Sequence, residues 1–175
     1  PSESLNMIGV TGTNGKTTVT HMVDYLLEEL GKPTALIGTM YRKIGEERIE
    51  TRNTTPEILT VHETLQKVKE IGGDTCIMEV SSHALQLGRV WGIDYNVAVF
   101  TNLTHEHLDL HKTMENYFNA KKKIFSMLRN NGVGIVNIDD KYGEKIYSEK
   151  KDGNNDYISI SIKNEEADVW GDILN

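Results

Sequence analysis

The sequence predicts an α/β domain with a phosphate-binding loop and a mostly parallel sheet that has helices on both faces. Short apolar runs alternate with longer segments of helical periodicity along the 175 residues, as in right-handed βαβ units. One of these units contains "GVTGTNGKTT" (9–18), a glycine-rich turn between a strand pattern and a helix pattern. No apolar run approaches the roughly 20 residues that a membrane span needs.

The first βα unit extends to about residue 39. The apolar run 5–10 predicts a strand, and Gly31 can end the helix that follows. Residues 33–39 then predict the next strand, and the charged segment 40–53 predicts a hairpin or an exposed loop. The apolar positions expected on one face of the first helix are Val19, Met22, Val23, Leu26 and Leu30.

The segment 54–73 predicts a second helix, with a capping threonine, Pro56 in the first turn and a glycine pair at its end. Runs at 75–80 and 95–102 predict strands covered on both faces. Cys76 lies in the first run, and because it is the only cysteine we expect a reduced core residue. The apolar positions of the helix are Ile58, Val61, Leu65, Val68 and Ile71.

The last third of the sequence continues the alternation. A helix is expected at 113–128, a strand at 132–138, a polar helix at 140–150, and strands near 156–162 and 167–174. Without repeats or an obvious linker, residues 1–175 are expected to form one domain, cut from something larger and truncated at its C-terminal edge. A formal net charge of -7 argues against nucleic acid and membrane surfaces as partners.

The glycine-rich loop is expected to hold phosphate groups. Gly12 and Gly15 let backbone N–H groups crowd an anion at the start of a helix. Lys16 would reach the outer phosphates, and the Thr17 hydroxyl would ligate Mg²⁺. The common pattern has glycine where this chain has Val10, so the alternative is a Gly/Thr-rich turn with a solvated lysine.

Acidic and histidine side chains follow the later strands. Glu79 ends an apolar run, and we expect it either to meet the Mg²⁺ of a nucleotide or to be a buried edge carboxylate with a helix-terminus partner. The segment 101–111 contains three histidines, but its spacing does not fit His-Glu-x-x-His, so a closed zinc site is not expected. His107 is a candidate ligand for Mg²⁺ or Mn²⁺; otherwise it is a solvated loop residue.

Lys121 falls on the apolar stripe of the helix expected at 113–128, midway between Phe118 and Phe125. Burial favours the neutral amine. A neutral amine can combine with carbon dioxide to give a carbamate, whose oxygens can ligate Mg²⁺. The alternative is a lysine whose stem is buried and whose ammonium reaches water.

The motifs "TGTNGKTT", "NTTPE" (53–57), "MEVSSHAL" (78–85) and "VFTNLTHEHLDLHKTMENYFNAKKKIF" (99–125) together resemble the central domain of the Mur ligases. These are cytoplasmic ATP-dependent enzymes of peptidoglycan synthesis, and the motif order is similar to the type that adds the third amino acid. The resemblance covers the chain to about residue 140. It also accounts for the glycine spacing, since Gly-x-x-Gly-x-x-Gly-Lys-Thr is this superfamily's form of the loop.

The resemblance implies roles for particular residues. The ATP phosphates would be held by Gly12, Thr13, Asn14, Gly15, Lys16, Thr17 and Thr18. The catalytic residues would be Lys16, Glu79, His107 and carbamylated Lys121, with Thr17, Glu79, His107 and Lys121 at the metal. The UDP-N-acetylmuramoyl-dipeptide would contact Asn53, Thr54, Thr55, Ser81 and Arg89. Two departures from the family pattern are Glu106, where many members have Asp, and Leu87, where some have a substrate-contacting Gln.

The reaction implied by the resemblance is amide-bond formation by way of an acyl phosphate. ATP and Mg²⁺ would activate the carboxylate of UDP-N-acetylmuramoyl-L-alanyl-D-glutamate, which a free amino acid, meso-diaminopimelate or L-lysine, then attacks. The resemblance further implies a cytoplasmic location, and we expect a monomer. Because the uridine-binding and amino-acid-binding domains of the family are absent from these residues, we expect this segment alone to bind Mg-ATP weakly and not to ligate. The alternative is a P-loop ATPase or nucleotide-binding module without ligase chemistry.

Overall fold

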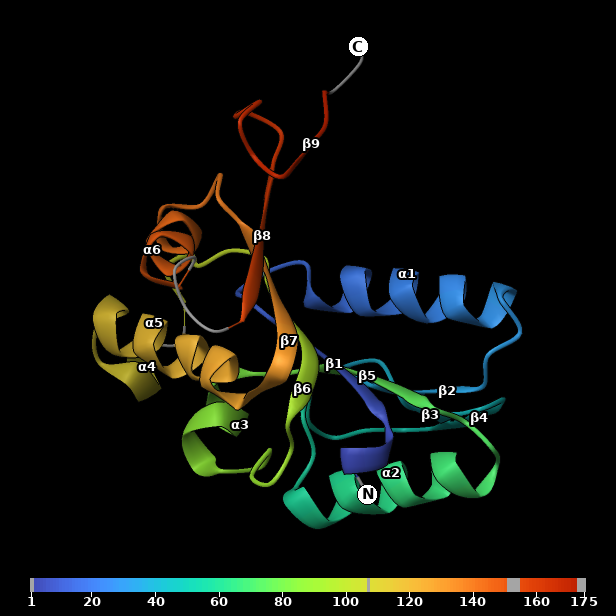
Figure 1. Ribbon diagram of the computed structural model, residues 1–175. Helices are drawn as coiled ribbons and strands as arrows, with labels where there is room; N and C mark the ends of the chain where they lie inside the picture. The colour runs from blue at the N-terminus through green and yellow to red at the C-terminus, as the bar shows by residue number, and fades with distance from the viewer. Residues whose placement is uncertain (1, 107, 151–154, 173–175) are drawn as a thin grey trace.

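The computed structural model describes residues 2–106, 108–150 and 155–172. Within these residues one nine-stranded sheet forms the centre of the molecule (Figure 1). The strands are β1 Asn6–Thr11, β2 Thr34–Ile37, β3 Arg42–Ile44, β4 Glu47–Ile49, β5 Thr75–Glu79, β6 Tyr95–Phe100, β7 Leu128–Asn137, β8 Asp156–Ser161 and β9 Val169–Trp170. The helices are α1 Lys16–Glu29, α2 Ile58–Glu70, α3 Ser82–Leu87, α4 Leu108–His111, α5 Met114–Lys122 and α6 Lys141–Lys150, with 3-10 segments at Ser2–Ser4 (η1) and Lys123–Met127 (η2).

The strand order is β4-β3-β2-β5-β1-β6-β7-β8-β9, and only the pairs β2–β3 and β3–β4 are antiparallel. The predicted mostly parallel sheet is therefore confirmed, and the segment 40–53 forms the hairpin that was one of its two predicted alternatives. β1 lies in the middle of the sheet, between β5 and β6. The loop that follows β1 consequently lies beside the loops that follow both neighbouring strands, which is where ligands bind in open parallel sheets.

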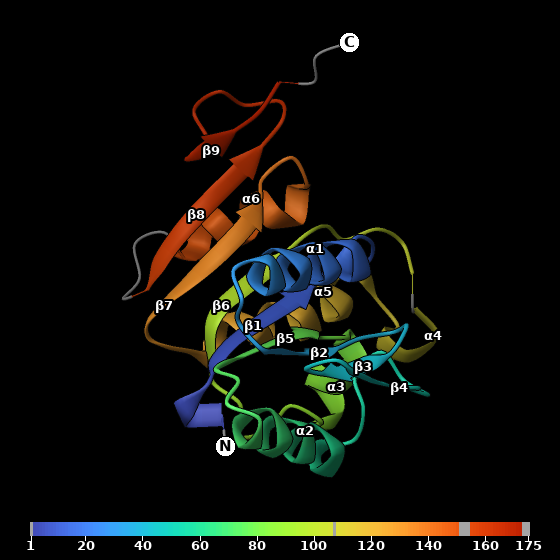
Figure 2. The same ribbon diagram turned by 90° about the vertical axis from the view of Figure 1, so that its right-hand side faces the viewer.

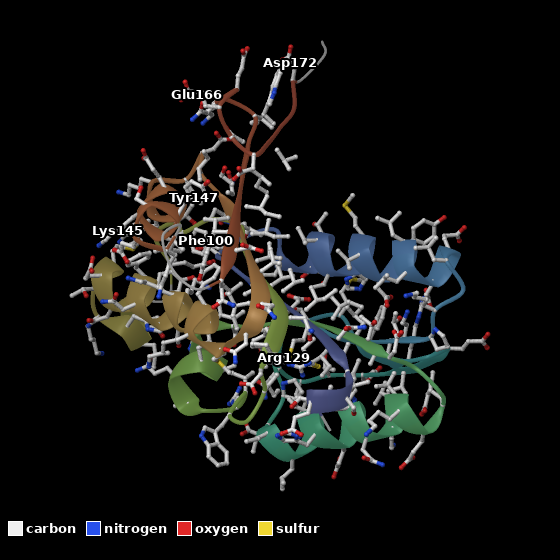
Figure 3. The ribbon with its side chains drawn as sticks, in the orientation of Figure 1. Phe100, Arg129, Lys145, Tyr147, Glu166 and Asp172 are labelled. Carbon is white, nitrogen blue, oxygen red and sulfur yellow. The ribbon has the colours of Figure 1, made fainter. Side chains whose placement is uncertain are left out.

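The helices lie on both faces of the sheet, as predicted, but unequally. Figures 1 and 2 show α1 on one face and α2, α3, α5 and α6 on the other. This follows from right-handed crossovers: among the connections that contain a helix, β1 to β2 moves across the sheet in one direction and the others move in the opposite direction. The main core lies on the four-helix side, where Phe100, labelled in Figure 3, is fully buried.

On the α1 side, no described helix covers β6, β7 and β8 (Figure 2). Val136 of β7 and its neighbours Ala98 and Phe100 of β6 point into the main core. Because side chains alternate along a strand, the residues that lie between these positions in the sequence face the open side. Val97 pairs with Val133, and Ile135 pairs with Ile158; all four are only half-buried. The prediction that the 95–102 strand is covered on both faces is therefore only partly confirmed for β6, where Val99 is buried but Val97 is not. β5 is buried along its whole length.

The first helix forms where predicted, but its buried face is not the predicted one. Met22, Leu26 and Leu30 are exposed, whereas Thr20 and Asp24 are buried against the sheet. Polar contacts explain this orientation, because the Asp24 carboxylate accepts a hydrogen bond from the Thr34 hydroxyl and forms an ion pair with a buried lysine of β3. No described helix is long and apolar enough to cross a bilayer.

Two other helices differ from their predicted limits. The helix predicted at 54–73 begins only at Ile58, and Thr55 does not cap it. The Thr55 hydroxyl instead donates to the Glu79 carbonyl and accepts from the Ser81 N–H. The helix predicted at 113–128 is capped by Thr113 as an α-helix but becomes 3-10 after Lys122. The short helices α3 and α4 were not predicted, because neither is long enough to show a period.

Removal of the Lys43 side chain is expected to destabilise the fold. Its ammonium contacts Asp24 at 2.5 Å and Glu28 at 2.7 Å, and both Lys43 and Asp24 are buried. Lys43→Ala leaves the Asp24 carboxylate without its cation, which typically costs about 3–5 kcal/mol for a buried pair. Urea denaturation would measure this loss in the free energy of unfolding.

The matched control is Glu28→Gln, which removes the partly exposed partner of the same lysine. We expect that substitution to cost no more than about 1 kcal/mol. Equal effects of the two substitutions would contradict the importance assigned to the buried pair.

Candidate active site

The loop between β1 and α1 has a backbone that only glycine suits at two positions. Gly12 and Gly15 have positive φ angles, of 150° and 85°. A Cβ atom at Gly12 would lie 1.9 Å from the Thr101 Oγ1, so a larger residue would force the loop off the β6 side of the site. Because the loop leads directly into the first turn of α1, its N–H groups and the helix dipole favour an anion there.

The Lys16 ammonium is held inside this loop by backbone carbonyls. Its Nζ donates to the Gly12 oxygen at 3.0 Å and to the Thr13 oxygen at 2.8 Å. Burial lowers the pKa of Lys16, while Glu79 and Glu106 oppose that shift. No carboxylate in the described residues forms an ion pair with it, so its charge is available to a bound anion.

The Glu79 carboxylate lies at the end of β5 and is fully buried. It accepts hydrogen bonds from the Thr17 hydroxyl at 3.0 Å, from the Thr39 N–H at 2.9 Å and from the Thr39 hydroxyl at 3.0 Å. The structure thus brings together Thr17 and Glu79, two of the residues predicted at the metal. Thr39 is a partner that the sequence analysis missed, since nothing in its local pattern distinguishes it.

The amine of Lys121 reaches the same loop from α5. The side chain is 1% exposed, and its Nζ donates to the Gly12 oxygen at 2.7 Å. Burial, together with the neighbouring charge of Lys16, lowers the pKa of Lys121 to about 7, with Glu106 opposing. The predicted inward orientation is confirmed, and the alternative of an ammonium that reaches water is wrong.

A cavity of about 390 Å³ and another of about 330 Å³ lie near α5, and only the second contains the predicted groups. The Arg89 guanidinium, at its rim, contacts the Thr55 carbonyl at 3.3 Å and the Glu57 carboxylate at 2.8 Å. The smaller cavity therefore joins the predicted substrate residues to both lysines of the loop. Its lining residues are Lys16, Asn53, Thr54, Thr55, Ser81, Ser82, His83, Arg89 and Lys121.

The remaining predicted residues lie as follows. Asn14 is exposed in the loop, where its N–H donates to Asn102 Oδ1 at 2.9 Å. Thr18 is exposed in the first turn of α1. Leu87 is exposed on α3, and His107 lies outside the described residues.

The residues present suit a hard cation such as Mg²⁺. A carboxylate and a hydroxyl 3.0 Å apart offer oxygen ligands beside the loop, and phosphate oxygens commonly complete such a site. No group of three or more His, Cys, Asp or Glu side chains in the described residues could hold a metal. Among the described residues, the arrangement therefore does not resemble a closed protein cage.

Comparison with known proteins identifies the same family as the sequence motifs. The family described as Mur ligase middle domain matches residues 10–175. The UDP-N-acetylmuramoyl-L-alanyl-D-glutamate--2,6-diaminopimelate ligase of Lactiplantibacillus plantarum is 53% identical over 152 residues, covering 83% of this chain and 31% of that protein. The enzyme of the same name from Clostridium tetani is 50% identical over 149 residues, covering 85% and 30%.

Solved structures give the same relationship. The structure of a UDP-N-acetylmuramoyl-L-alanyl-D-glutamate--2,6-diaminopimelate ligase superposes with a TM-score of 0.84 and 30% identity, covering 95% of this chain and 34% of that chain. MurF from Acinetobacter baumannii superposes with a TM-score of 0.70 at 22% identity, a likeness of fold alone. This chain spans about a third of the length of these relatives. Since the middle-domain match extends over nearly the whole sequence, the chain belongs to the Mur ligase family.

Proposed function

We propose that this chain is the nucleotide-binding part of a ligase that joins 2,6-diaminopimelate to UDP-N-acetylmuramoyl-L-alanyl-D-glutamate with the consumption of ATP. The observation that carries the proposal is the convergence of Lys16 and Lys121 on one carbonyl of the phosphate loop. A phosphate loop alone serves many reactions. A second, buried lysine between that loop and a polar cavity is suited to a reaction in which two anions must meet.

The two anions are the triphosphate of ATP and the acceptor carboxylate. They repel each other, so positive charge has to be held between them in a fixed position. Lys16 supplies one charge from within the loop. Thr17 and Glu79, with His107 as the further predicted ligand, would hold Mg²⁺, which supplies charge neutralisation for the transferring phosphoryl group.

The residues of the loop and of the cavity would then align the acceptor carboxylate with the γ-phosphorus of ATP. The carboxylate oxygen forms a bond to phosphorus as the bond to ADP breaks, which gives an acyl phosphate. The amine of the incoming amino acid next attacks the acyl carbon, phosphate leaves, and the amine loses a proton. The residues proposed to hold the sugar-nucleotide dipeptide at the cavity are Asn53, Thr54, Thr55, Ser81 and Arg89.

Lys121 is proposed to act as a carbamate. Its neutral amine would bond to the carbon of carbon dioxide and release one proton, which leaves two carboxylate-like oxygens on the side chain. Such an anion could ligate a second Mg²⁺ between ATP and the acceptor. The lowered pKa supports this proposal, because the amine has to be neutral before it can react.

The proposals for the amino-acid substrate and for the cellular location draw on the relatives. Their names specify 2,6-diaminopimelate, which favours that substrate over L-lysine. We further propose a monomeric enzyme of the cytoplasm, without nucleic-acid or membrane partners. The net charge of -7 supports the absence of such partners.

The proposal predicts that phosphate release by the full-length protein requires all three substrates together. We expect release from ATP only when both the UDP-N-acetylmuramoyl-dipeptide and diaminopimelate are present, because the acyl phosphate forms on the acceptor and is consumed by the amine. A phosphate-release assay with each substrate omitted in turn would measure this. Release without the sugar nucleotide would favour the second candidate, a P-loop ATPase without ligase chemistry.

Carbamylation of Lys121 is expected to increase as the pH rises through about 7. The neutral fraction of this amine grows over that range because its pKa lies near 7, whereas exposed lysines stay protonated until about pH 10. Carbon-13 NMR of the protein, equilibrated with labelled bicarbonate at a fixed level of dissolved carbon dioxide, would detect the carbamate. Lys121→Met should remove the signal and Lys123→Met, at an exposed position, should not; a signal that survives Lys121→Met would contradict the assignment.

Glu79→Gln is expected to raise the Mg²⁺ concentration needed for half-maximal ligation by about 10-fold or more. The amide removes the negative charge but can still accept from the Thr39 N–H, so the fold should be retained. A titration of the full-length enzyme with Mg²⁺ at saturating ATP would measure the change. Glu63→Gln, on the exposed side of α2, is the control, and an unchanged Mg²⁺ requirement in Glu79→Gln would argue against a metal at this carboxylate.

A further inference from the structure

A buried histidine links the cavity to the phosphate loop and has no part in the mechanism above. His111, at the end of α4, is 3% exposed, and its Nε2 lies 2.9 Å from the Ser82 hydroxyl. Ser82 is itself buried and begins α3, directly after Ser81 at the cavity. The His111 backbone is also fixed, since its carbonyl accepts from the Thr113 N–H and from the Asn116 amide.

One face of the imidazole ring contacts Tyr117. The two rings are stacked, with centroids 4.9 Å apart and planes 25° apart. The Tyr117 hydroxyl lies 3.2 Å from the Thr13 Oγ1, and the Thr13 carbonyl accepts from Lys16. A continuous series of contacts thus leads from the start of α3 to the phosphate loop.

The same tyrosine supports the second lysine of the site. Lys121 follows Tyr117 by one helical turn, and its Nζ lies 4.8 Å from the centroid of the tyrosine ring. The ring therefore borders the amine on one side, while the Gly12 carbonyl holds it on another. Displacement of the ring would change where the amine, or a carbamate formed on it, lies relative to the loop.

Direct links between β5 and the β1–α1 region also exist: β5 pairs with β1, and the Thr11 hydroxyl donates to the Val80 carbonyl. A further link, to the start of α1, uses the atoms proposed to bind metal. The Thr17 hydroxyl donates to the Glu79 carboxylate, and both groups would turn to Mg²⁺ when it binds. The contacts through His111 and Tyr117 involve neither of these groups. They can hold the acceptor side and the phosphate side together while the metal is bound.

We propose that His111 is a positioning residue, which through Ser82 and Tyr117 fixes the acceptor-binding start of α3 relative to Lys121 and the phosphate loop. This inference rests on the proposed ligase function. A shift of about 1 Å in the alignment of reacting groups can cost about 100-fold in rate. The imidazole is therefore expected to affect the rate at saturating substrates more than the binding of ATP.

The test uses steady-state kinetics of the full-length enzyme. His111→Phe keeps a ring against Tyr117 but loses the bond to Ser82, and Ser82→Ala removes the other partner of that bond. We expect each to lower kcat about 10- to 100-fold with the KM for ATP nearly unchanged. The double variant should be no slower than the slower single variant, because both changes remove one shared interaction.

Two comparisons separate positioning from a loss of folding. His111→Gln, whose amide can reach Ser82 where Nε2 does, should recover most of kcat, and thermal unfolding of Ser82→Ala should stay close to that of the wild type. His62→Phe, on α2, is the matched control and should be unaffected. Unchanged kcat in His111→Phe and Ser82→Ala, or additive losses in the double variant, would overturn the proposal. Failure of the wild-type enzyme to ligate would instead overturn the proposed function.

Discussion

The site depends on how closely the Gly12 backbone approaches its neighbours. The Gly12 carbonyl accepts from both Lys16 and Lys121, which brings two amines of like charge to one oxygen. That approach is possible because no Cβ separates Gly12 from Thr101, and because α5 directs a buried lysine toward the loop. Burial first, and then the like charge of Lys16, lower the pKa of Lys121 to about 7. The fold itself thus places a buried amine of lowered pKa beside the glycine-rich loop.

Much of this fold could be predicted because the informative patterns are local. The period of α5 placed Lys121 on a buried stripe, and the turn between β1 and α1 placed Lys16 and Thr17 at a helix start. Local patterns failed where a distant partner decides the outcome. α1 turns Asp24 rather than Leu26 toward the sheet, because β3 brings Lys43 to that carboxylate.

The same limit applies to the site. Glu79 could be predicted at the end of its strand, but its partner Thr39 could not, because the two residues are joined only by the pairing of β2 with β5. His111 was considered only as one member of a histidine-rich segment. Its bond to Ser82 and its stacking on Tyr117 form only when α3, α4 and α5 pack against one another. Burial of β6 was overestimated for a related reason: an apolar run does not show whether a helix covers each face of its sheet.

The distribution of charge is compatible with the anionic substrates proposed for this acidic protein. The net charge of -7 describes the long-range field, but the cavity between α3 and α5 contains Lys16, Lys121 and Arg89. Arg89 is paired with Glu57, whereas Lys16 is held by carbonyls, which orient its charge without neutralising it. In a partly buried site a fixed local charge is screened far less than the exposed charges of the surface. The acidic surface therefore does not conflict with the proposal that these few groups face two negatively charged substrates.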